Sequence, residues 1–160
     1  MSTVTVTEFI EAQDVDVWRL LTDLSGRAGW LSTVGAVDVV TTGGFGPGTS
    51  WREMRVRPDG DEQPEEFLIV EAVAPERLVL SSPGAGVDYR ITWTLRTVER
   101  RGRGCTAVTV EQEAVPTAAY GRVLALILGG LAARAVEGAL RRDLADLAVA
   151  AAPSTSAEAA

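Results

Sequence analysis

The sequence predicts an α+β fold in which an antiparallel sheet packs against one long C-terminal helix. Three observations support this prediction. Residues 117–151 contain no proline and are dominated by alanine, leucine and arginine, which favour helices. Upstream segments alternate apolar and polar residues and are rich in β-branched side chains. Short segments rich in glycine and proline connect these strands, and strands joined by tight turns pair in the antiparallel direction.

The long helix is predicted over residues 117–151, between Pro116 and Pro153. Its apolar residues recur at three- and four-residue intervals from Tyr120 to Leu147, and most of its charges lie in the second half. At 1.5 Å per residue it would be about 50 Å long, so it needs a broad apolar surface to pack against. Residues 123–133 are uncharged, but a membrane span takes about twenty apolar residues, so a soluble helix is favoured.

The preceding chain is predicted to form one strand, two short helices and a meander of about six strands. The first strand spans 3–10, and the helices occupy 15–24 and the neighbourhood of Trp30, with Asp14 capping the first helix. The meander strands are predicted at 34–40, 49–57, 65–73, 77–82, 89–98 and 106–115, with a hairpin turn at 101–104. We expect a single domain over residues 1–152 and a flexible tail over 153–160.

Composition excludes several classes of function. The chain has 160 residues and a net charge of −7, and its arginines form no run longer than two, so nucleic-acid binding is not expected. It contains no histidine and no lysine, which excludes histidine-based triads and metal sites, Schiff bases and P-loop lysines. We therefore expect no metal and no cofactor. The single Cys105 and the absence of a signal peptide predict a cytoplasmic protein.

Several short motifs follow one another along the chain. Residues 14–24 end in Leu-Leu-Thr-Asp-Leu and precede Trp30, and residues 46–51 read Gly-Pro-Gly-Thr-Ser-Trp. Residues 71–78 read Glu-Ala-Val-Ala-Pro-Glu-Arg-Leu, and residues 104–106 read Gly-Cys-Thr. Together with the terminal helix, these motifs cover almost the whole chain. Their order resembles the START/Bet v 1-like (SRPBCC) superfamily, in particular its polyketide cyclase/dehydrase and lipid-transport group.

The resemblance implies a helix-grip fold, in which a curved antiparallel sheet of about six or seven strands wraps around the C-terminal helix and leaves a cavity. It also implies a hydrophobic or aromatic ligand that is polyketide-like or lipid-like. Cyclases of this group shape a poly-ketone chain and move protons without covalent catalysis. This sequence departs from them at Glu71, where a cavity arginine would be expected in a cyclase.

Trp51, Glu53 and Arg55 share one face of a predicted strand. If that face is concave, a carboxylate and a guanidinium point into an apolar interior and must pair with each other or with a ligand. Burial would then raise the pKa of Glu53, and Arg55 would lower it again. If the opposite face is concave, Met54 and Val56 point inward and the three form a surface ladder. The pattern of the strand leaves both orientations open.

Tyr89 completes the set of catalytic candidates with Glu53 and Arg55, because it lies on the apolar face of the strand 89–98. Gln112 is a polar residue on an otherwise apolar face, so it would need a partner inside. For the aromatic candidates, ligand contact and simple core filling remain equally open. The full set of expected ligand contacts is Trp30, Trp51, Phe67, Ile69, Trp93, Val110, Gln112, Tyr120, Leu124 and Leu128.

These observations predict a protein that binds a hydrophobic or aromatic small molecule in an internal cavity. Two classes remain open. One is a polyketide cyclase, aromatase or dehydratase that works by acid–base chemistry without metal or cofactor. The other is a non-catalytic carrier or sensor that uses the same cavity. An interaction module acting through the sheet edge or the helix has less support, and a homodimer is left open.

Overall fold

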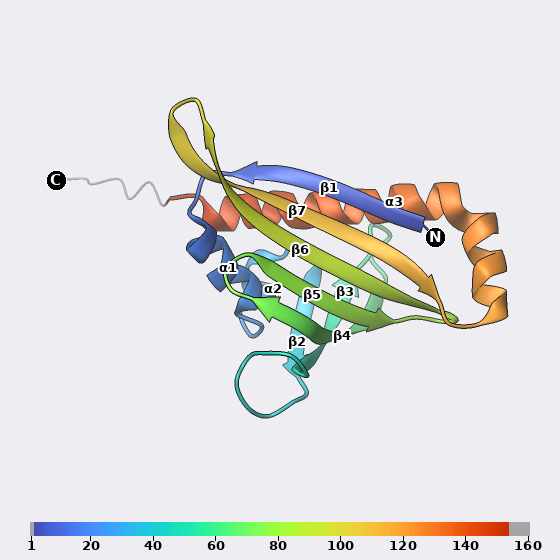
Figure 1. The fold of residues 1–160 in the computed structure, drawn as a ribbon. Coiled ribbons are helices and arrows are strands. Elements are labelled where there is room, and N and C mark those ends of the chain that lie inside the picture. The colour runs from blue at the N-terminus through green and yellow to red at the C-terminus, as the bar shows by residue number, and fades with distance from the viewer. Residues whose placement is uncertain (1, 154–160) are drawn as a thin grey trace.

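Figure 1 shows the computed structural model, which describes residues 2–153; the side chains of residues 121–131 are outside the description. The expected tail therefore lies almost wholly outside the described residues. The elements follow in the order β1 (Ser2–Ile10), α1 (Asp14–Thr22), α2 (Arg27–Trp30), β2 (Val34–Val39), β3 (Ser50–Val56), β4 (Glu62–Val73), β5 (Arg77–Pro83), β6 (Val87–Arg100), β7 (Arg103–Pro116) and α3 (Ala119–Ala151).

The strands form one seven-stranded antiparallel sheet in the order β1-β7-β6-β5-β4-β3-β2. Strands that follow one another from β2 to β7 are neighbours, as expected for hairpins joined by short turns. β1 pairs with β7, so the first and last strands of the chain lie side by side. α3 runs along the sheet beside these two strands (Figure 1). The predicted helix-grip fold, with its curved sheet and terminal helix, is confirmed.

The β6–β7 hairpin is longer than predicted. Arg100 pairs with Arg103, so the turn consists of only Arg101 and Gly102 instead of residues 101–104. Both turn residues have positive φ values, 53° and 75°, which is the geometry of a tight two-residue hairpin turn. The ladder therefore continues to the tip, and both strands reach 14 residues.

Two predicted helix starts are wrong by one or two residues, each for a local reason. The backbone N–H groups of Thr117 and Ala118 donate to the carbonyl of Gly86, so α3 begins only at Ala119. Asp14 is the first residue of α1 and not its cap; the cap position is held by Gln13. The Asp14 carboxylate instead accepts a hydrogen bond from the neighbouring backbone N–H, 2.7 Å away.

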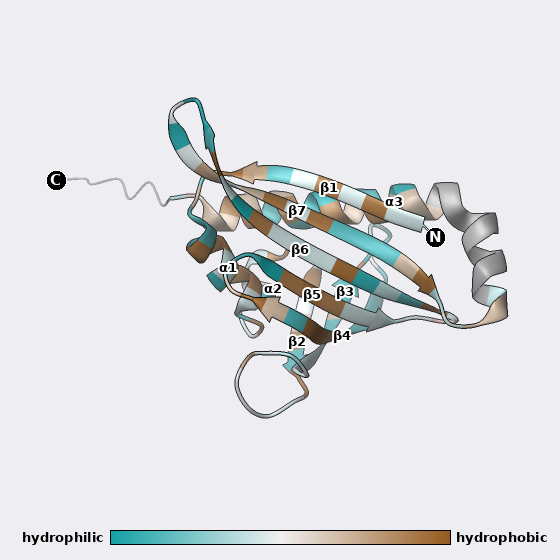
Figure 2. Cartoon of the chain, in the orientation of Figure 1, coloured by the Kyte–Doolittle hydropathy of each residue, from teal (hydrophilic) through white to brown (hydrophobic). Residues whose placement is uncertain are grey.

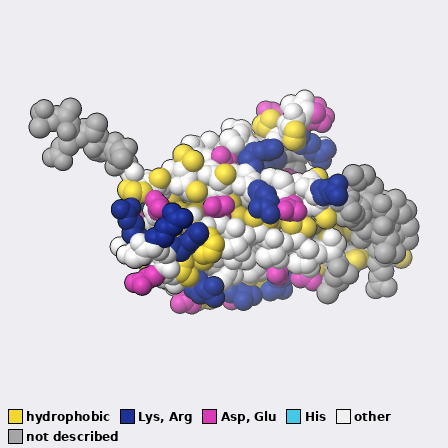
Figure 3. Space-filling model, turned by 90° about the horizontal axis from the view of Figure 1, so that it is seen from above, with side chains coloured by type: hydrophobic (Ala, Val, Ile, Leu, Met, Phe, Trp, Pro, Cys, Tyr) yellow, Lys and Arg dark blue, Asp and Glu magenta, His cyan; other side chains and the backbone are white. Residues whose placement is uncertain are grey.

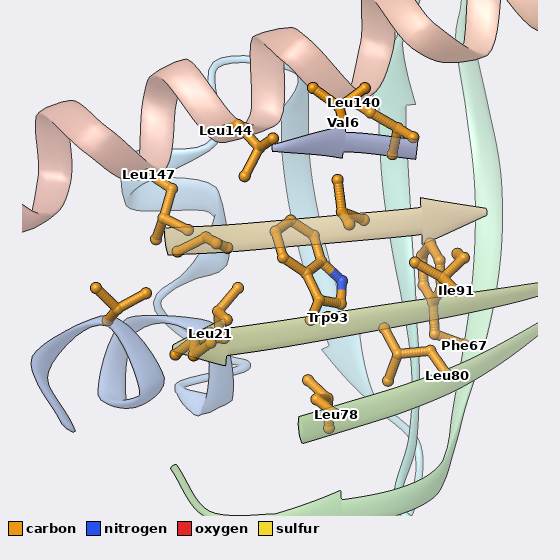
Figure 4. Packing of buried hydrophobic residues seen from close by; sticks show 14 of the residues in the cluster. Val6, Leu21, Phe67, Leu78, Leu80, Ile91, Trp93, Leu140, Leu144 and Leu147 are labelled. Atoms are coloured by element: carbon orange, nitrogen blue, oxygen red, sulfur yellow. The ribbon is translucent and has the colours of Figure 1, made fainter. Parts of the chain in front are cut away.

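The core lies on the concave face of the sheet. Brown apolar segments alternate with paler or teal segments along the strands in Figure 2, as expected for a sheet with one covered face. Four paired residues form a buried row across the sheet, namely Leu78, Trp93, Val110 and Val6. Leu140, Leu144 and Leu147 of α3 lie against the same cluster in Figure 4. Among the residues whose side chains the structure describes, which leave out 121–131 of α3, no helix is both long and apolar enough to cross a bilayer.

Leu144 tests how strongly α3 holds the sheet. Its side chain is fully buried, so Leu144→Ala should lower the free energy of unfolding by about 2–5 kcal/mol, through lost apolar burial and the cavity left behind. Urea unfolding followed by tryptophan fluorescence measures this change. Val149→Ala, at a position that is 79% exposed on the same helix, is the control and should change stability by less than about 0.5 kcal/mol.

Candidate functional site

β3 directs Trp51 and Glu53 into the interior, where each side chain is only 1% exposed. Successive strand residues point to opposite faces, so Arg55 lies on the same side and Met54 on the other. The first of the two orientations left open by the sequence is therefore the one the protein adopts. β3 is paired on both sides, with β2 and with β4, which holds this face inward.

The Glu53 carboxylate accepts four hydrogen bonds. Arg27 donates from Nε to Oε2 at 2.8 Å and from Nη2 to Oε1 at 3.3 Å. Trp51 Nε1 donates to Oε2 at 3.1 Å, and Arg55 Nε donates to Oε1 at 2.9 Å. A carboxylate offers about four acceptor positions, so Glu53 has none left for a ligand.

The pKa of Glu53 reflects this environment. Burial by itself would raise the pKa, because a charged group loses its hydration inside a protein. The charges of Arg27 and Arg55 and the hydrogen bonds from Arg27 and Trp51 outweigh burial, and the pKa of Glu53 lies below its ordinary value of 4.5. Glu53 is thus ionised at neutral pH, and a saturated carboxylate of low pKa is poorly suited to proton transfer.

Arg55 extends the contacts from β3 to α3. Its Nη1 donates to both oxygens of Asp143, at 2.9 and 3.1 Å, and to the hydroxyl of Thr33 at 3.1 Å. Thr33 in turn donates to Asp143 at 3.2 Å. Burial lowers the pKa of Arg55, but the carboxylates of Asp143 and Glu53 outweigh burial and raise it above its ordinary value.

Arg27, Glu53, Arg55 and Asp143 therefore form a buried set of two cations and two anions, which we call the ion network. Its side chains are at most 17% exposed, so its interactions are less screened than those of surface pairs. Glu65 lies at its edge, 3.8 Å from Arg55 and 48% exposed. Burial raises the pKa of Glu65, and the charge of Arg55 reduces that shift without reversing it.

An aromatic stack adjoins the ion network. The Trp51 ring stacks on Phe67 of β4, with ring centroids 5.2 Å apart and planes at 23°. The guanidinium of Arg27 lies 5.4 Å from the Trp51 centroid, within the range of a cation–π contact. Arg27 is thus held both by the carboxylate of Glu53 and by the indole, so α2 is fixed against β3.

The segment after α2 is also bonded to α3. The backbone N–H and the hydroxyl of Ser32 both donate to one oxygen of Asp146, at 2.8 and 2.7 Å. With the Thr33–Asp143 bond, two successive residues of this segment are anchored to carboxylates of one helix. Hydrogen bonds to Asp143 and Asp146 therefore connect this segment to α3.

The other predicted contacts lie along rows of paired residues on the concave face. Phe67, Ile69, Trp93 and Val110 are buried there. Ile69 pairs with Leu80, Leu80 with Ile91, Ile91 with Gln112 and Gln112 with Val4, so Gln112 is the polar member of an otherwise apolar row. Burial falls off where these rows reach β6, β7 and β1, and four inward residues are only half-buried there: Val4, Tyr89, Gln112 and Ala114. We call these four residues the half-buried corner.

Tyr89 is not brought together with Glu53 and Arg55. Two strands separate β6 from β3, which corresponds to about 14 Å at the usual strand spacing. Tyr89 also borders an open depression of ≈ 220 Å³ on the outer side, with Val70, Ser81, Asp88, Arg90 and Val115. The three catalytic candidates thus do not form one constellation.

The remaining candidates have different surroundings. Trp30 is half-buried against the core, and its Nε1 is buried without a hydrogen-bond partner in the described part of the chain. Tyr120 is 57% exposed, and its ring lies against Gly86, where an added β-carbon would come within 2.4 Å of Cε2. Leu124 and Leu128 have side chains outside the described residues. Glu71 is 43% exposed and pairs with Arg77, so it does not enter the interior.

Sequence analysis missed Arg27 and Asp143. Asp143 carried a usable signal, because it is spaced three and four residues from Leu140 and Leu147 and so lies on the buried face of α3. A carboxylate on an apolar helix face needs a partner. Arg27 carried no comparable signal, since it lies in a short glycine-flanked segment. Among the side chains that the structure describes, no group of three histidine, cysteine or carboxylate residues gathers as a metal site.

Comparisons with known proteins agree with this architecture. Residues 1–152 match the sequence profile of the family described as "Polyketide cyclase / dehydrase and lipid transport". No curated protein sequence matches. The fold is similar to that of the Zhui aromatase/cyclase from a Streptomyces species, at a TM-score of 0.71 and 16% identity over 93% of this chain and 92% of that one.

Two further solved structures show the same fold. A START superfamily protein from Mycobacterium smegmatis has a TM-score of 0.68 and 8% identity, over 94% of this chain and 97% of that one. The protein TTHA0849 from Thermus thermophilus has a TM-score of 0.61 and 24% identity, over 92% and 98%. At these identities the likeness concerns the fold alone. The superfamily resemblance stated from the sequence is confirmed.

Glu53→Gln tests the ion network. The substitution keeps the shape of the side chain but leaves Arg27 and Arg55 without their shared anion, so it should lower the free energy of unfolding by about 3–5 kcal/mol. Because the folded-state pKa of Glu53 is lowered, its contribution is complete above pH 4.5 and is lost as the pH falls through the folded-state pKa. The stability difference between wild type and variant should therefore shrink in acid.

Urea titrations from about pH 7 to about pH 3 measure this difference. Glu66→Gln is the matched control, because Glu66 pairs with Arg52 on the surface and is 52% exposed. It should cost about 1 kcal/mol or less. A difference for Glu53→Gln that stays constant down to pH 3 would contradict the assigned ionisation.

Proposed function

The chain belongs to the polyketide cyclase/dehydrase and lipid transport family, and on that premise we propose that it binds a hydrophobic or aromatic small molecule on the concave face of its sheet. The ligand is polyketide-like or lipid-like. The half-buried corner is its binding region. The aromatic stack of Trp51 and Phe67 extends the apolar surface of the concave face beyond this corner. A binding site of this kind is mostly apolar with a few polar groups that orient the ligand.

The observation that carries this proposal is the gradient of burial along the concave face. The row from Leu78 to Val6 is buried against the cluster that contains the leucines of α3. Residues of the half-buried corner face the same side and retain exposed surface. Inward-facing apolar surface that is still exposed to water favours ligand binding, because covering it contributes about 25 cal/mol of favourable binding free energy per Å².

Two polar side chains give the corner its selectivity. The Tyr89 hydroxyl can donate or accept a hydrogen bond, and the Gln112 amide can do both at once. Both lie among apolar neighbours, Ile91 above all, which pairs directly with Gln112. A ligand with a carbonyl or hydroxyl group on a hydrophobic skeleton satisfies this combination, whereas a purely aliphatic chain leaves both polar groups unpaired.

The ion network favours a carrier or sensor over an enzyme. A general acid or base must reach a reacting atom and exchange a proton near neutral pH. Glu53 is saturated with hydrogen bonds and has a lowered pKa, and Arg55 is bonded to Asp143 and has a raised pKa. Their role in this proposal is to hold α2 and α3 in place around the binding region.

Cyclisation, aromatisation or dehydration remains the second candidate function, and one observation favours it. Tyr89 is half-buried on the inward face and, within the described residues, forms no hydrogen bond with a charged side chain, so of the three catalytic candidates it is the one available to a ligand. If the protein is an enzyme, Tyr89→Phe should abolish turnover while weakening ligand binding by only about tenfold or less, the effect of one lost hydrogen bond. A carrier would show no turnover in the wild type.

Binding is tested with a hydrophobic fluorescent probe, anilinonaphthalene sulfonate, and with Ala114→Phe. Ala114 pairs with Tyr89 and lies in the half-buried corner, so an added ring occupies the proposed binding space. The variant should bind the probe about tenfold more weakly, which corresponds to about 1.4 kcal/mol. Fluorescence titration measures the dissociation constant, and native mass spectrometry of freshly purified protein identifies any ligand that copurifies.

Thr92→Phe is the matched control. Thr92 lies on the neighbouring strand β6 and alternates with Ile91 and Trp93, so its side chain faces the outer side. It should leave the probe affinity unchanged. Equal affinities for wild type and Ala114→Phe, with the fold retained by circular dichroism, would reject the corner as the binding region.

A further inference from the structure

The outer face of the sheet carries a basic and aromatic cluster at the far end of the β6–β7 hairpin. We define the arginine cluster as Arg96, Arg100, Arg101, Arg103 and Phe9. Arg96 and Arg100 alternate with the inward residues of β6 and so lie on the outer face. Phe9 and Arg96 both pair with Ala107, so Phe9, Ala107 and Arg96 form one row across the sheet. Arg103 is paired directly with Arg100, and Arg101 occupies the turn.

Phe9 is the aromatic member of this cluster and lies in contact with Arg100. Its ring is 43% exposed on the outer face of the sheet. The guanidinium of Arg100 lies over the ring, 4.2 Å from the centroid. Stacking of this kind orients the planar guanidinium while the N–H groups at its edge stay available for a bidentate contact with phosphate.

The cluster is electrostatically unfavourable in the isolated protein. Like charges placed directly opposite each other across a hairpin are destabilising, and Arg100 and Arg103 are such a pair with Arg101 beside them. Within the described part of the chain, none of the four arginines forms an ion pair with a carboxylate, whereas six other arginines do. Figure 3 shows dark blue side chains gathered over this end of the molecule.

We propose that the arginine cluster docks the protein on a membrane surface that contains anionic phospholipids. Lipid phosphates supply the negative charge that would neutralise the guanidinium groups, and four basic residues is the smallest cluster size associated with binding to anionic lipid surfaces. The exposed Phe9 favours a lipid surface over an acidic soluble protein, because the acyl boundary accepts an aromatic ring. The hairpin extends past the end of β1 in Figure 1, so its tip can reach a flat surface.

The charge of the rest of the protein makes this docking directional. The net charge is −7, so an anionic surface repels the chain as a whole and attracts it only where cations gather. The protein would thus approach the membrane with the hairpin tip first. This inference does not depend on what the concave face binds.

Vesicle flotation with the full chain tests the proposal. Vesicles of phosphatidylcholine alone are compared with vesicles of phosphatidylcholine and phosphatidylglycerol, at about 0.05 M and about 0.5 M salt, where screening shortens the range of the attraction severalfold. We expect binding to the anionic vesicles at low salt, weaker binding at high salt and none to the neutral vesicles. The double variant Arg100→Glu, Arg103→Glu should lower partitioning by at least about tenfold.

The control carries the same change in charge elsewhere. Arg90 and Arg142 are both exposed, so Arg90→Glu, Arg142→Glu alters net charge equally and should retain most of the binding. Phe9→Ala should weaken binding severalfold at unchanged charge. Circular dichroism and urea unfolding establish that each variant is folded.

Three results would overturn the proposal. Equal binding to neutral and anionic vesicles would show that lipid charge is not recognised. Equal loss in both double variants would show that net charge matters and the cluster does not. Binding of polyglutamate without binding of either vesicle would assign the cluster to an acidic protein partner in place of a membrane.

Discussion

A buried carboxylate sets the main constraint on this structure. Glu53 lies on the inward face of β3 with almost no exposure, and an ionised carboxylate is stable there only if cations and hydrogen-bond donors surround it. Arg27 and Arg55 supply the charge, and Arg55 in turn requires Asp143. The requirement for charge balance therefore links α2, β3 and α3, which are distant in sequence.

These links differ in kind from the apolar contacts of the core. The hydrophobic contribution of the α3 leucines is non-directional, whereas a hydrogen-bonded ion pair holds only within a narrow range of distances and angles. Asp143 and Asp146 bind Thr33 and Ser32, so the same helix turn also fixes the chain that leads into β2. A buried ion network adds little net stability compared with apolar packing, but its loss is costly and its geometry is specific.

The concave face is consequently divided into two regions. Near β3 and α2 the polar groups are saturated by one another, and aromatic rings pack beside them. Near the start of β6 and the end of β7, Tyr89 and Gln112 are half-buried among apolar residues. The proposed ligand site lies in the second region, because its polar groups do not compete with internal ion pairs. The outer face adds the arginine cluster, whose charge is not balanced within the described residues.

Local patterns predicted most of the secondary structure. The order of strands and helices, the antiparallel pairing and the length of α3 follow from residue periodicity and turn residues, which act over a few positions. The β6–β7 turn was predicted two residues too long because Arg101 adopts a positive φ, a conformation that arginine rarely takes. α3 begins two residues later than predicted, because the carbonyl of Gly86, distant in sequence, accepts hydrogen bonds from the N–H groups of the two residues that were expected to begin the helix.

The candidate site was predicted only in part. Strand periodicity placed Trp51, Glu53 and Arg55 on one face, which is correct, and it left the direction of that face open because Met54 and Val56 are also compatible with burial. The partners that complete the ion network lie 26 and 88 positions away along the chain. No local pattern could join them.

The sequence by itself determined the class of fold, the exclusion of histidine- and lysine-based chemistry and the set of residues that share each strand face, because these depend on composition and on neighbours a few positions apart. The tertiary structure alone decided which face of β3 is inward, which cations neutralise Glu53 and which polar side chains of the concave face stay half-buried. Those outcomes depend on desolvation and charge pairing between segments that meet only in the folded chain.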